Sequence, residues 1–493
     1  MQQDISPVVL ALVLCGSMSS GFEKNSAYLI SSQAVILVAS LVSQVVLTRN
    51  LLANEYGLIV ILIDIGMTLS LLIDFGMPTW LTREWDGSKE TITGLISKVM
   101  KSEIKILIIM SASALIALYY VDEIASFYCI ILSCLILMIV EPHRLGLRLA
   151  DRTEFEAISR SMERVLMLIG YLYLEYNNAL SLENIGVMLL VCSIITLLAT
   201  QSLYHRFVFS RFEFINVEIG FLEIMKNSLP FSLALAIYPL IGRTDKLLLG
   251  FFSGALSVGI YNIGWIVISV GLMITSKLRQ AILPELAETK TNEEKIAVIM
   301  KARPLINSLV LIGIPICLLA SYFLLELVFP KEYLIYDDIA EIAGFDLILM
   351  MLPLWVWSMF SIGGLEASKF HKNKWVFLNS LLGGLLINGL ACSILIPSHG
   401  VVGAVIGSIL AQFSIFIIVS YVNDIHRKES ITFISDLIAG LMITISCFIL
   451  AYVDLSIKQM SFELIGSILS MVIALLLISK DLFPYVSKRV FNG

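Results

Sequence analysis

The sequence predicts an all-α polytopic membrane protein with about 14 transmembrane helices. Its composition is 58% hydrophobic and 15% charged, whereas soluble domains carry roughly 25% charged residues. Apolar runs of about 20 residues, the length that crosses a hydrocarbon core, recur along the whole chain. Basic residues gather in every second loop, which is the pattern of loops that face the cytoplasm.

Six apolar runs in the first half predict the helices of an N-terminal lobe. The first run follows Lys24-Asn25-Ser26, and the second follows a turn that ends in Tyr56-Gly57. A mixed polar and apolar segment, residues 86–103, separates the second run from the third. The predicted spans are Ala27–Thr48, Gly57–Leu81, Ile104–Val121, Ile124–Val140, Phe155–Leu174 and Ile185–Tyr204.

Further apolar runs in the second half predict helices 7 to 14. The seventh run follows Lys226-Asn227-Ser228, and residues 285–303 precede the ninth, as residues 86–103 precede the third. The predicted spans are Leu229–Leu249, Val258–Leu283, Leu305–Phe329, Phe345–Ile362, Val376–Ile396, Val401–Val422, Ile431–Val453 and Leu464–Leu482.

The distribution of basic residues sets the predicted orientation. Loops after the even-numbered spans hold nearly all of them, while the alternate loops carry only Arg49, Lys331 and Lys458. Both termini are therefore predicted to be cytoplasmic. The predicted parts are a leader at 1–23 that is either cytoplasmic or precedes the true start, an N-lobe at 24–226 with helices 1–6, a C-lobe at 227–428 with helices 7–12, and residues 429–493 with helices 13–14 and a C-terminal tail.

Two stretches about 200 residues apart share sparse identities without a gap. The matched pairs are Lys24 and Lys226, Asn25 and Asn227, Ser26 and Ser228, Ala53 and Ala255, and Gly57 and Gly259. Two homologous halves would leave such a trace, and many transporters are built in this way. The halves are not equivalent: Leu41, Ser43 and Gln44 stand where the second half has Arg243, Asp245 and Lys246.

Charged residues within or at the ends of the apolar runs are the candidate site residues, because charge in lipid is costly and marks protein-lined or water-filled surroundings. They are Arg49, Arg160, Arg164, Arg243 and Lys246 among the bases, and Asp64, Asp74, Glu163 and Asp245 among the acids. One interpretation is structural pairing, for example Glu163 with Arg160, or Asp245 with Lys246 or Arg243. The other is a cavity that binds anions, because the planar guanidinium group matches phosphate oxygens.

Motifs of enzymes and metal sites are absent from the sequence. No P-loop, HExxH or nucleophile elbow occurs, and the five histidines lie in or beside loops. The seven cysteines lie almost entirely within apolar runs and have no ligand spacing. We therefore expect a chain that is not an enzyme, with no catalytic residues, no metal site and no organic cofactor.

Several short motifs in a fixed order carry a family resemblance. They are Thr48-Arg49-Asn50-Leu51-Leu52, Glu55-Tyr56-Gly57, Asp74-Phe75-Gly76, Asp245-Lys246-Leu247-Leu248-Leu249-Gly250, Val258-Gly259-Ile260-Tyr261, Ala281-Ile282-Leu283-Pro284 and Gly400-Val401-Val402-Gly403-Ala404. From Lys24 to about helix 14 the chain resembles the polysaccharide transporter family of the multidrug/oligosaccharidyl-lipid/polysaccharide exporter superfamily, which includes the O-antigen flippases. The resemblance implies two six-helix lobes around a central cavity that opens alternately inward and outward.

The implied function is to flip an undecaprenyl-diphosphate-linked oligosaccharide, such as an O-antigen, capsule or exopolysaccharide repeat unit, from the cytoplasmic to the outer leaflet of the inner (plasma) membrane. The five bases named above are expected to meet phosphate or sugar. The four acids are expected to pair with them or to bind a coupling H⁺ or Na⁺. Expected partners are the lipid-linked cargo, membrane lipids, and the polymerase and chain-length regulator of the same pathway, but no nucleic acid.

Three alternatives stay open. A drug/cation antiporter of the same superfamily would favour acids over bases in its cavity, and here the two are about equal. A lipid II flippase is closer, although the loop signatures usual in that family are not recognised here. A polysaccharide polymerase or ligase would carry a large outside loop with arginines, whereas the outside loops here are short.

Overall fold

The fold was analysed in a computed structural model. The structure describes residues 21–74, 76–77, 81, 91–118, 124–212, 220–287, 289, 291–334, 342–369 and 375–454. Residues 1–20 of the predicted leader and the last predicted span, Leu464–Leu482, lie outside the described residues.

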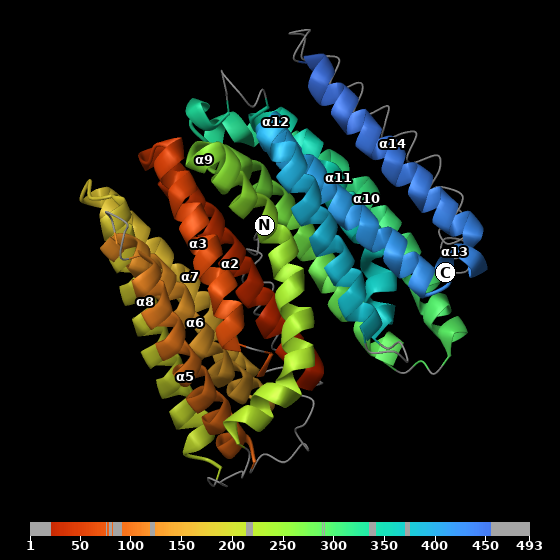
Figure 1. The fold of residues 1–493 in the computed structure, drawn as a ribbon. Coiled ribbons are helices and arrows are strands. Elements are labelled where there is room, and N and C mark those ends of the chain that lie inside the picture. Colours follow the sequence, from red (N-terminus) through yellow and green to blue (C-terminus); the bar gives the residue numbers. More distant parts are fainter. Residues whose placement is uncertain are drawn as a thin grey trace, which may run out of the picture. The chain divides into compact units, whose positions relative to one another are not determined.

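Helices account for all the regular structure in the described residues (Figure 1). In the first half they are α2 (Gly21–Asn50), α3 (Ala53–Asp74), α5 (Ile92–Leu118), α6 (Ile124–Leu149), α7 (Thr153–Tyr176), α8 (Leu182–Tyr204) and the π-helical turn η1 (His205–Phe209). Then follow α9 (Phe221–Ala287), α10 (Asn292–Val328), the 3₁₀ turn η2 (Lys331–Tyr333), α11 (Gly344–Lys369), α12 (Trp375–Val422), α13 (Ile425–Lys428) and α14 (Ser430–Asp454).

The predicted all-α membrane architecture is confirmed. The first thirteen predicted spans each fall on helix, although α3 ends at Asp74 rather than at Leu81, and the last predicted span is not described. Within the described residues, 9 helices are long and apolar enough to cross a membrane when each kinked helix is counted once. α5 and α7 are not among them, because charged residues interrupt their apolar sequence. In α7, for example, these residues include Arg160, Glu163 and Arg164.

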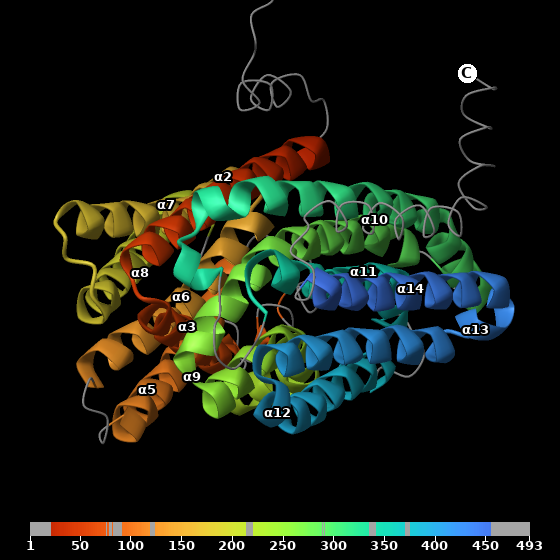
Figure 2. The same cartoon turned by 90° about the horizontal axis from the view of Figure 1, so that it is seen from above.

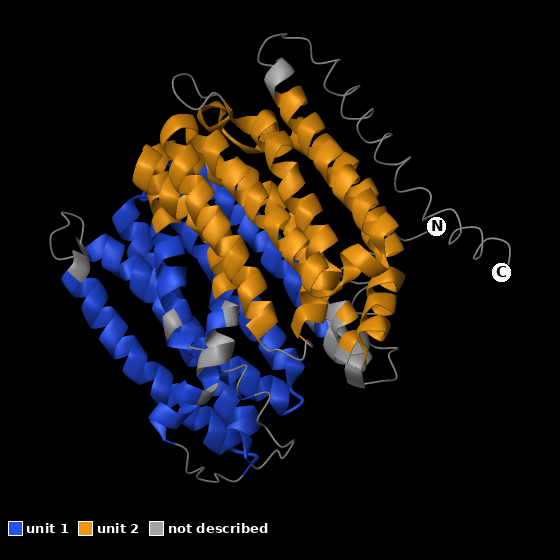
Figure 3. Ribbon diagram, turned by 45° about the vertical axis from the view of Figure 1, so that its right-hand side comes forward, with its two compact units in different colours: residues 1–52, 62–236 blue, residues 53–61, 237–493 orange. Residues whose placement is uncertain are grey.

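Contacts divide the chain into two compact units (Figure 3). Unit 1 comprises residues 1–52 and 62–236, and unit 2 comprises residues 53–61 and 237–493. The start of α3 therefore belongs to unit 2, although the rest of that helix belongs to unit 1. The lobe boundaries drawn from the sequence stay a prediction.

In unit 1, α6 packs against α5, α7 and α8, and α2 packs along α7. Side chains from α5, α6 and α8 meet Met77, which follows α3, in one apolar cluster that includes Ile96, Leu145 and Tyr204. The opposite face of α5 is different in character, with exposed residues such as Ile109. Exposed apolar faces of this kind suit contact with lipid tails, while the backbone polar groups stay satisfied within the helices.

In unit 2, α11 is the central helix. It contacts α10, α12 and α14, which lie around it in both views (Figure 2). Of the apolar stretch of α11 that is long enough to span a membrane, 83% is buried, compared with 22% for α14 and 28% for α10. Trp357 of α11 lies between Phe413 and Phe416 of α12, and its indole donates to Thr444 Oγ1 of α14 at 3.1 Å.

Two long helices are each broken by a glycine with positive φ. Gly254 has φ 85° and ψ 173° inside α9, and Gly400 has φ 48° and ψ −124° inside α12. Glycine adopts such angles without the Cβ penalty that other residues incur. These breaks fall between predicted spans 7 and 8 and between spans 11 and 12, so each helix supplies two spans as the sequence predicted.

Two glycines in unit 2 allow the backbones of α3 and α9 to touch. A Cβ on Gly57 would lie 1.8 Å from the carbonyl oxygen of Ala255, and a Cβ on Gly259 would lie 2.3 Å from that of Ala53. These four residues are the repeat positions matched in the sequence. Each glycine thus contacts the alanine that precedes the other glycine by four residues, which is the reciprocal pattern that a two-fold relation produces.

A short loop segment of unit 2 closes over this crossing. Glu332 of η2 accepts a hydrogen bond from the first amide of α3, on Ala53, at 3.1 Å. Next to it, the fully buried Tyr333 meets the ring of Tyr56 edge-on at 5.7 Å, and Asn262 Nδ2 donates to the Tyr56 hydroxyl at 2.7 Å. Burial, reinforced by the Glu332 carboxylate, raises the pKa of the Tyr333 phenol, so this ring stays neutral.

We expect Gly57→Ala to destabilise the protein by about 1–3 kcal/mol, because its methyl group would collide with backbone that cannot rotate away. Gly389→Ala is the matched control: nothing lies within 4 Å of its Cβ position, and alanine favours helix by about 1 kcal/mol. Thermal unfolding of the purified protein in detergent measures both. Equal melting temperatures for Gly57→Ala and wild type would contradict the crossing.

Candidate functional site

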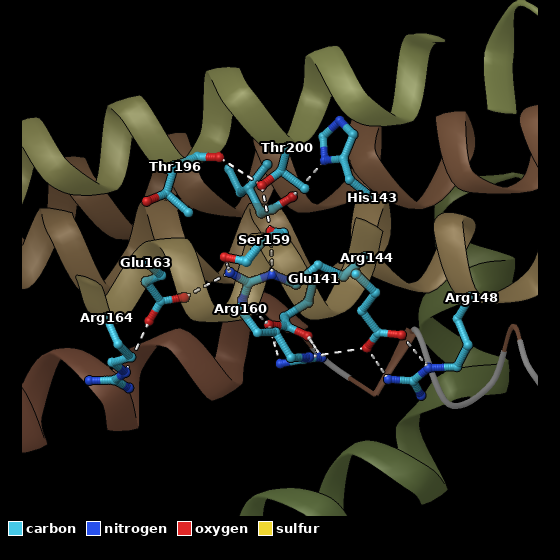
Figure 4. A network of polar contacts seen from close by, with 12 residues as sticks. Glu141, His143, Arg144, Arg148, Ser159, Arg160, Glu163, Arg164, Thr196 and Thr200 are labelled. Atoms are coloured by element: carbon cyan, nitrogen blue, oxygen red, sulfur yellow. Dashed lines mark hydrogen bonds and ion pairs between the residues drawn. The ribbon is translucent and has the colours of Figure 1, made fainter. Parts of the chain in front are cut away.

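The α6–α7 hairpin of unit 1 brings a row of charged side chains on α6 against a second row on α7 (Figure 4). α6 ends at Leu149, and α7 begins at Thr153 after a turn in which Asp151 has a φ of 58°. The last turns of α6 therefore face the first turns of α7. Residues three or four apart on each helix line the seam between them.

Arg144 is the most deeply buried cation of this hairpin, with 2% of its surface exposed. Its guanidinium group donates to Glu141 Oε1 at 2.7 Å, to Glu163 Oε2 at 2.9 Å, and to the hydroxyl and carbonyl oxygens of Ser159 at 2.9 and 3.1 Å. Ser159 Oγ lies 2.7 Å from Thr200 Oγ1 on α8. Arg144 is thus fully engaged and ties three helices together.

Arg160 binds Glu141 and Glu156, and Arg148 binds Glu156 as well. Arg160 binds Glu141 with both terminal nitrogens, at 3.2 and 2.7 Å, and its Nε donates to Glu156 Oε1 at 3.0 Å. On the other side of Glu156, Arg148 donates from Nε to Oε2 at 2.8 Å and from Nη2 to Oε1. The Glu156 side chain is fully buried, whereas those of Arg160 and Arg148 are 25% and 47% exposed. Both arginines are neutralised but can be reached from outside.

Glu163 completes the row with partners other than Arg160, the one named in the pairing interpretation. It accepts from Arg144 and lies 3.5 Å from Arg164 Nε. The reason is that Arg160 is already occupied by Glu156, one turn before it on α7, and by Glu141 on α6. The Arg164 side chain is 42% exposed, so its remaining donors are accessible.

The other predicted residues of unit 1 do not join this network. Arg49 lies exposed in the last turn of α2, next to Asn50, which donates to Glu175 Oε1 at the far end of α7 at 3.1 Å. That end is about 15 residues, or roughly 22 Å, from Arg160. Asp64 is buried in α3 with 7% of its surface exposed, and Asp74 ends α3 half-buried.

A second polar centre surrounds Asp245 in unit 2. This carboxylate has no exposed surface. Its Oδ2 accepts from the Tyr261 hydroxyl at 2.5 Å and from Ser408 Oγ at 2.6 Å, and its Oδ1 accepts from the Lys246 amide at 2.8 Å. Both parts of α9 and the second part of α12 therefore converge on one acid.

The side chains beside Asp245 extend this centre. Asn388, on the first part of α12, donates to the Ile241 carbonyl at 2.6 Å, and its Oδ1 accepts from Cys392 Sγ at 3.0 Å. Lys246 is 6% exposed, with its Nζ 5.6 Å from the Trp265 ring centroid in cation–π geometry. Arg243 lies three residues earlier on the same face of α9 and is half-buried. The three charged residues therefore have different surroundings: Asp245 accepts hydrogen bonds from Tyr261 and Ser408, whereas Lys246 lies against Trp265.

Sequence reasoning missed several residues of these networks. Glu141 and Arg144 lie beyond the predicted end of a span at Val140, where the apolar run stops, whereas α6 continues to Leu149. Arg279 lies inside predicted span 8 and was not singled out. The further residues missed are Arg148, Glu156, Tyr261, Glu366, Asn388 and Ser408.

A third network lies within unit 2, between α9 and α11. Arg279 Nε donates to Glu366 Oε1 at 2.6 Å, and Lys369 Nζ donates to Glu366 Oε2 at 2.7 Å. Arg279 also lies over the ring of Tyr238 at 4.5 Å. By the predicted orientation, this network and the α6–α7 hairpin are both at the cytoplasmic ends of their helices.

The hairpin has the chemistry of an anion site. Its network holds four arginines, Arg144, Arg148, Arg160 and Arg164, and three glutamates, Glu141, Glu156 and Glu163, and the turn adds the ion pair of Arg152 with Glu154. Three of the arginines are partly exposed, and guanidinium donors bind phosphate oxygens in pairs. The Asp245 centre, which is closed to solvent, suits a small cation or a proton rather than an organic anion.

A family model described as "Polysaccharide biosynthesis protein" matches residues 22–290, which include the hairpin and Asp245. The comparison with curated proteins gave no match.

Solved structures share the fold at low identity. A MOP superfamily transporter from Pyrococcus furiosus is 12% identical with a TM-score of 0.55, and the match covers 85% of this chain and 96% of that chain. Lipid II flippase MurJ, in an inward closed conformation, is 14% identical with a TM-score of 0.53, over 95% and 99% of the two chains. An outward-facing multidrug resistance MATE family transporter is 12% identical with a TM-score of 0.54, over 86% and 98%. The chain therefore shares its fold with these solved structures.

We expect Arg144→Gln to destabilise the protein by about 3–5 kcal/mol, since it removes the buried counter-charge of Glu163, whose side chain is 9% exposed and retains only the contact with Arg164 at 3.5 Å. Arg148→Gln should cost only about 0–1 kcal/mol, because that side chain is 47% exposed and Glu156 retains Arg160. Thermal unfolding of the two variants side by side measures the difference. Equal losses would show that burial does not distinguish the two arginines.

Proposed function

This chain belongs to the polysaccharide biosynthesis protein family, and from that membership we propose that it is a flippase for a lipid-linked oligosaccharide. The observation that carries the proposal is the arginine-rich hairpin inside the region that the family model matches. The cargo we propose is an undecaprenyl-diphosphate-linked repeat unit of O-antigen, capsule or exopolysaccharide. It would move from the cytoplasmic to the outer leaflet of the plasma membrane.

The hairpin arginines would receive the diphosphate. Arg160 and Arg164 are partly exposed at the predicted cytoplasmic end of α7, where a cargo made in the cytoplasm arrives. A diphosphate offers the same planar pairs of oxygens that Glu141 and Glu156 now present to Arg160. Binding would therefore exchange one set of acceptors on Arg160 for another, and it would add the negative charge of the diphosphate to that of the glutamates. Arg243, Lys246 and Arg49 would meet the cargo later, near the predicted outer ends of their helices.

Asp245 would bind the coupling H⁺ or Na⁺. It collects hydrogen bonds from Tyr261 and Ser408 in helices that are distant in sequence, so a change in its charge would alter how those helices pack. Asp64 and Asp74 are further acids for this role in unit 1. Alternating access, in which binding at one side drives closure there, would couple the ion to the cargo.

Lipid II is the second candidate cargo. The specific observation is coverage: the lipid II flippase matches 95% of this chain, whereas the drug transporter matches 86%. This likeness, at 14% identity, is one of fold. Its greater coverage supports a lipid-linked cargo over a drug, and it does not choose the sugar. Rescue of a strain that lacks its lipid II flippase, with no effect on surface polysaccharide, would favour this candidate. In the polysaccharide pathway, the polymerase and the chain-length regulator would act on the exported unit.

Arg164→Ala and Arg243→Ala should each abolish or sharply reduce surface polysaccharide in a strain that depends on this protein. Each loses charge-assisted hydrogen bonds of about 1.5–3 kcal/mol, roughly a ten- to hundredfold loss of affinity. Immunoblots of surface polysaccharide and extraction of lipid-linked precursor measure the block. Arg206→Ala, which changes an exposed arginine of η1, is the control. Intact export in both test variants at normal protein levels would refute the role of these arginines.

Asp245→Asn should remove the response of transport to an ion gradient while leaving the shape of the side chain unchanged. Vesicles that contain the protein and a fluorescent undecaprenyl-diphosphate sugar would be given either a proton or a sodium gradient. Wild type should flip the lipid faster under one of the two, and Asp245→Asn should show no acceleration. Glu183→Gln, an exposed acid in the first turn of α8, is the control. If Asp245→Asn keeps the full acceleration, Asp245 is not the coupling acid.

A further inference from the structure

Glu103 on α5 is a buried carboxyl group without hydrogen bonds. It has no exposed surface, and neither of its oxygens has a hydrogen-bond partner within the described part of the chain. No other described carboxyl group has both oxygens in this condition. Glutamates are rarely fully buried unless they are paired, so the position calls for a chemical explanation.

The helical pattern of α5 explains how Glu103 comes to be buried. Val99 lies one turn before it and Ile106 one turn after it on the same face. Val99 is fully buried in an apolar cluster with Met77 and Leu145, and Ile106 packs against both that cluster and a second one around Leu135. The face that carries Glu103 is thus the core-facing side of α5. Its charged neighbours in sequence, such as Lys101 and Lys105, are exposed.

The charges that act on Glu103 are acidic. The titratable groups on the elements packed against this part of α5 are Asp74 on α3, Glu141 and His143 on α6, Tyr204 on α8, and Glu223 and Lys226 in the first turns of α9. Asp74 and Glu141 are near enough for their charges to act on Glu103. Both would repel a second carboxylate. Two arginines of the hairpin, Arg144 and Arg160, already donate to Glu141.

We propose that Glu103 is a proton-binding site, occupied in the conformation described. An ionised carboxylate that lacks hydrogen bonds and lies among apolar side chains costs several kcal/mol, even before its acidic neighbours are counted. The neutral acid avoids most of that cost. A metal ion does not serve instead, because no described group of three or more histidines, cysteines or acids has the geometry to hold one.

The site would link a proton to the cargo, and this step rests on the proposed function. When the diphosphate takes Arg160 from Glu141, the charge of Glu141 near Glu103 loses part of its compensation. A proton on Glu103 then keeps negative charge from accumulating at the hairpin. If Glu103 lost that proton, its carboxylate would compete with the cargo for Arg160 and Arg144. By linkage, diphosphate and proton therefore bind more tightly together than apart.

The proton itself can be tested without any transport measurement. Infrared spectra of the full-length protein in lipid vesicles at neutral pH should contain the C=O stretching band of a protonated carboxylic acid, which ionised carboxylates lack. That band should lose intensity in Glu103→Gln and stay intact in Glu183→Gln. If Glu103→Gln does not purify as a single species, Glu103→Met, which is apolar and of similar length, takes its place. Identical spectra for wild type and the Glu103 variant would overturn the proposal.

The link to the cargo has a separate test, with inorganic pyrophosphate as the probe. Its affinity for wild type should fall by up to about tenfold per pH unit as the pH rises and Glu103 loses its proton. The affinity for Glu103→Gln should change only as far as pyrophosphate itself titrates. Parallel pH curves for the two proteins would overturn the link. If neither binds pyrophosphate, the diphosphate role in the proposed function fails, and the infrared result still decides whether Glu103 holds a proton.

Discussion

Burying arginine in an apolar helix bundle requires an acid within reach, and the α6–α7 hairpin is built around that requirement. Arg144 is buried, and a charged side chain that is buried without partners is energetically costly. Glu141, Glu163 and Ser159 surround its guanidinium group and accept its hydrogen bonds. Removing either partner of such a pair costs more than the pair contributes, so the residues stabilise one another as a set. The remaining arginines of the hairpin extend from this set toward the surface. Burial and exposure to the surface thereby fall to different side chains of one network.

A second constraint acts on the backbone. Gly57 and Gly259 each admit the carbonyl of the alanine that precedes the other glycine by four residues. A sequence match between positions about 200 residues apart is sparse evidence for a repeat, but direct reciprocal contact between those same positions is an independent geometric reason to accept it. The symmetry stops at the charges. Ser43, which matches Asp245, donates to the Ala39 carbonyl in its own helix at 2.8 Å, whereas Asp245 gathers donors from three helical segments.

The sequence was sufficient for the helices, but not for the partners of the charged side chains, nor for several of the charges that form the networks. Hydropathy alone located the spans, and the glycines at 254 and 400 separate helices where breaks were predicted. Partners could not be predicted from the sequence. An arginine can have acids at suitable spacings on its own helix, and the choice depends on which acids a neighbouring helix places beside it. Arg160 illustrates this: Glu163 is three residues away, yet Glu141 on another helix occupies its fork. Glu103 was missed because a lone acid at the end of a polar segment resembles a solvated one.

The location of these networks bears on how such a protein can move. The hairpin network closes within unit 1, and the Asp245 and Arg279 networks close within unit 2. A motion of one unit relative to the other leaves these three networks intact, so it need not expose an unpaired charge to lipid. The charges that do change partner must then respond to a ligand or a proton. Under the proposed function, the affinity for the cargo would be set inside a unit, at Arg160 and Glu141, and a motion between units would respond to that exchange rather than cause it.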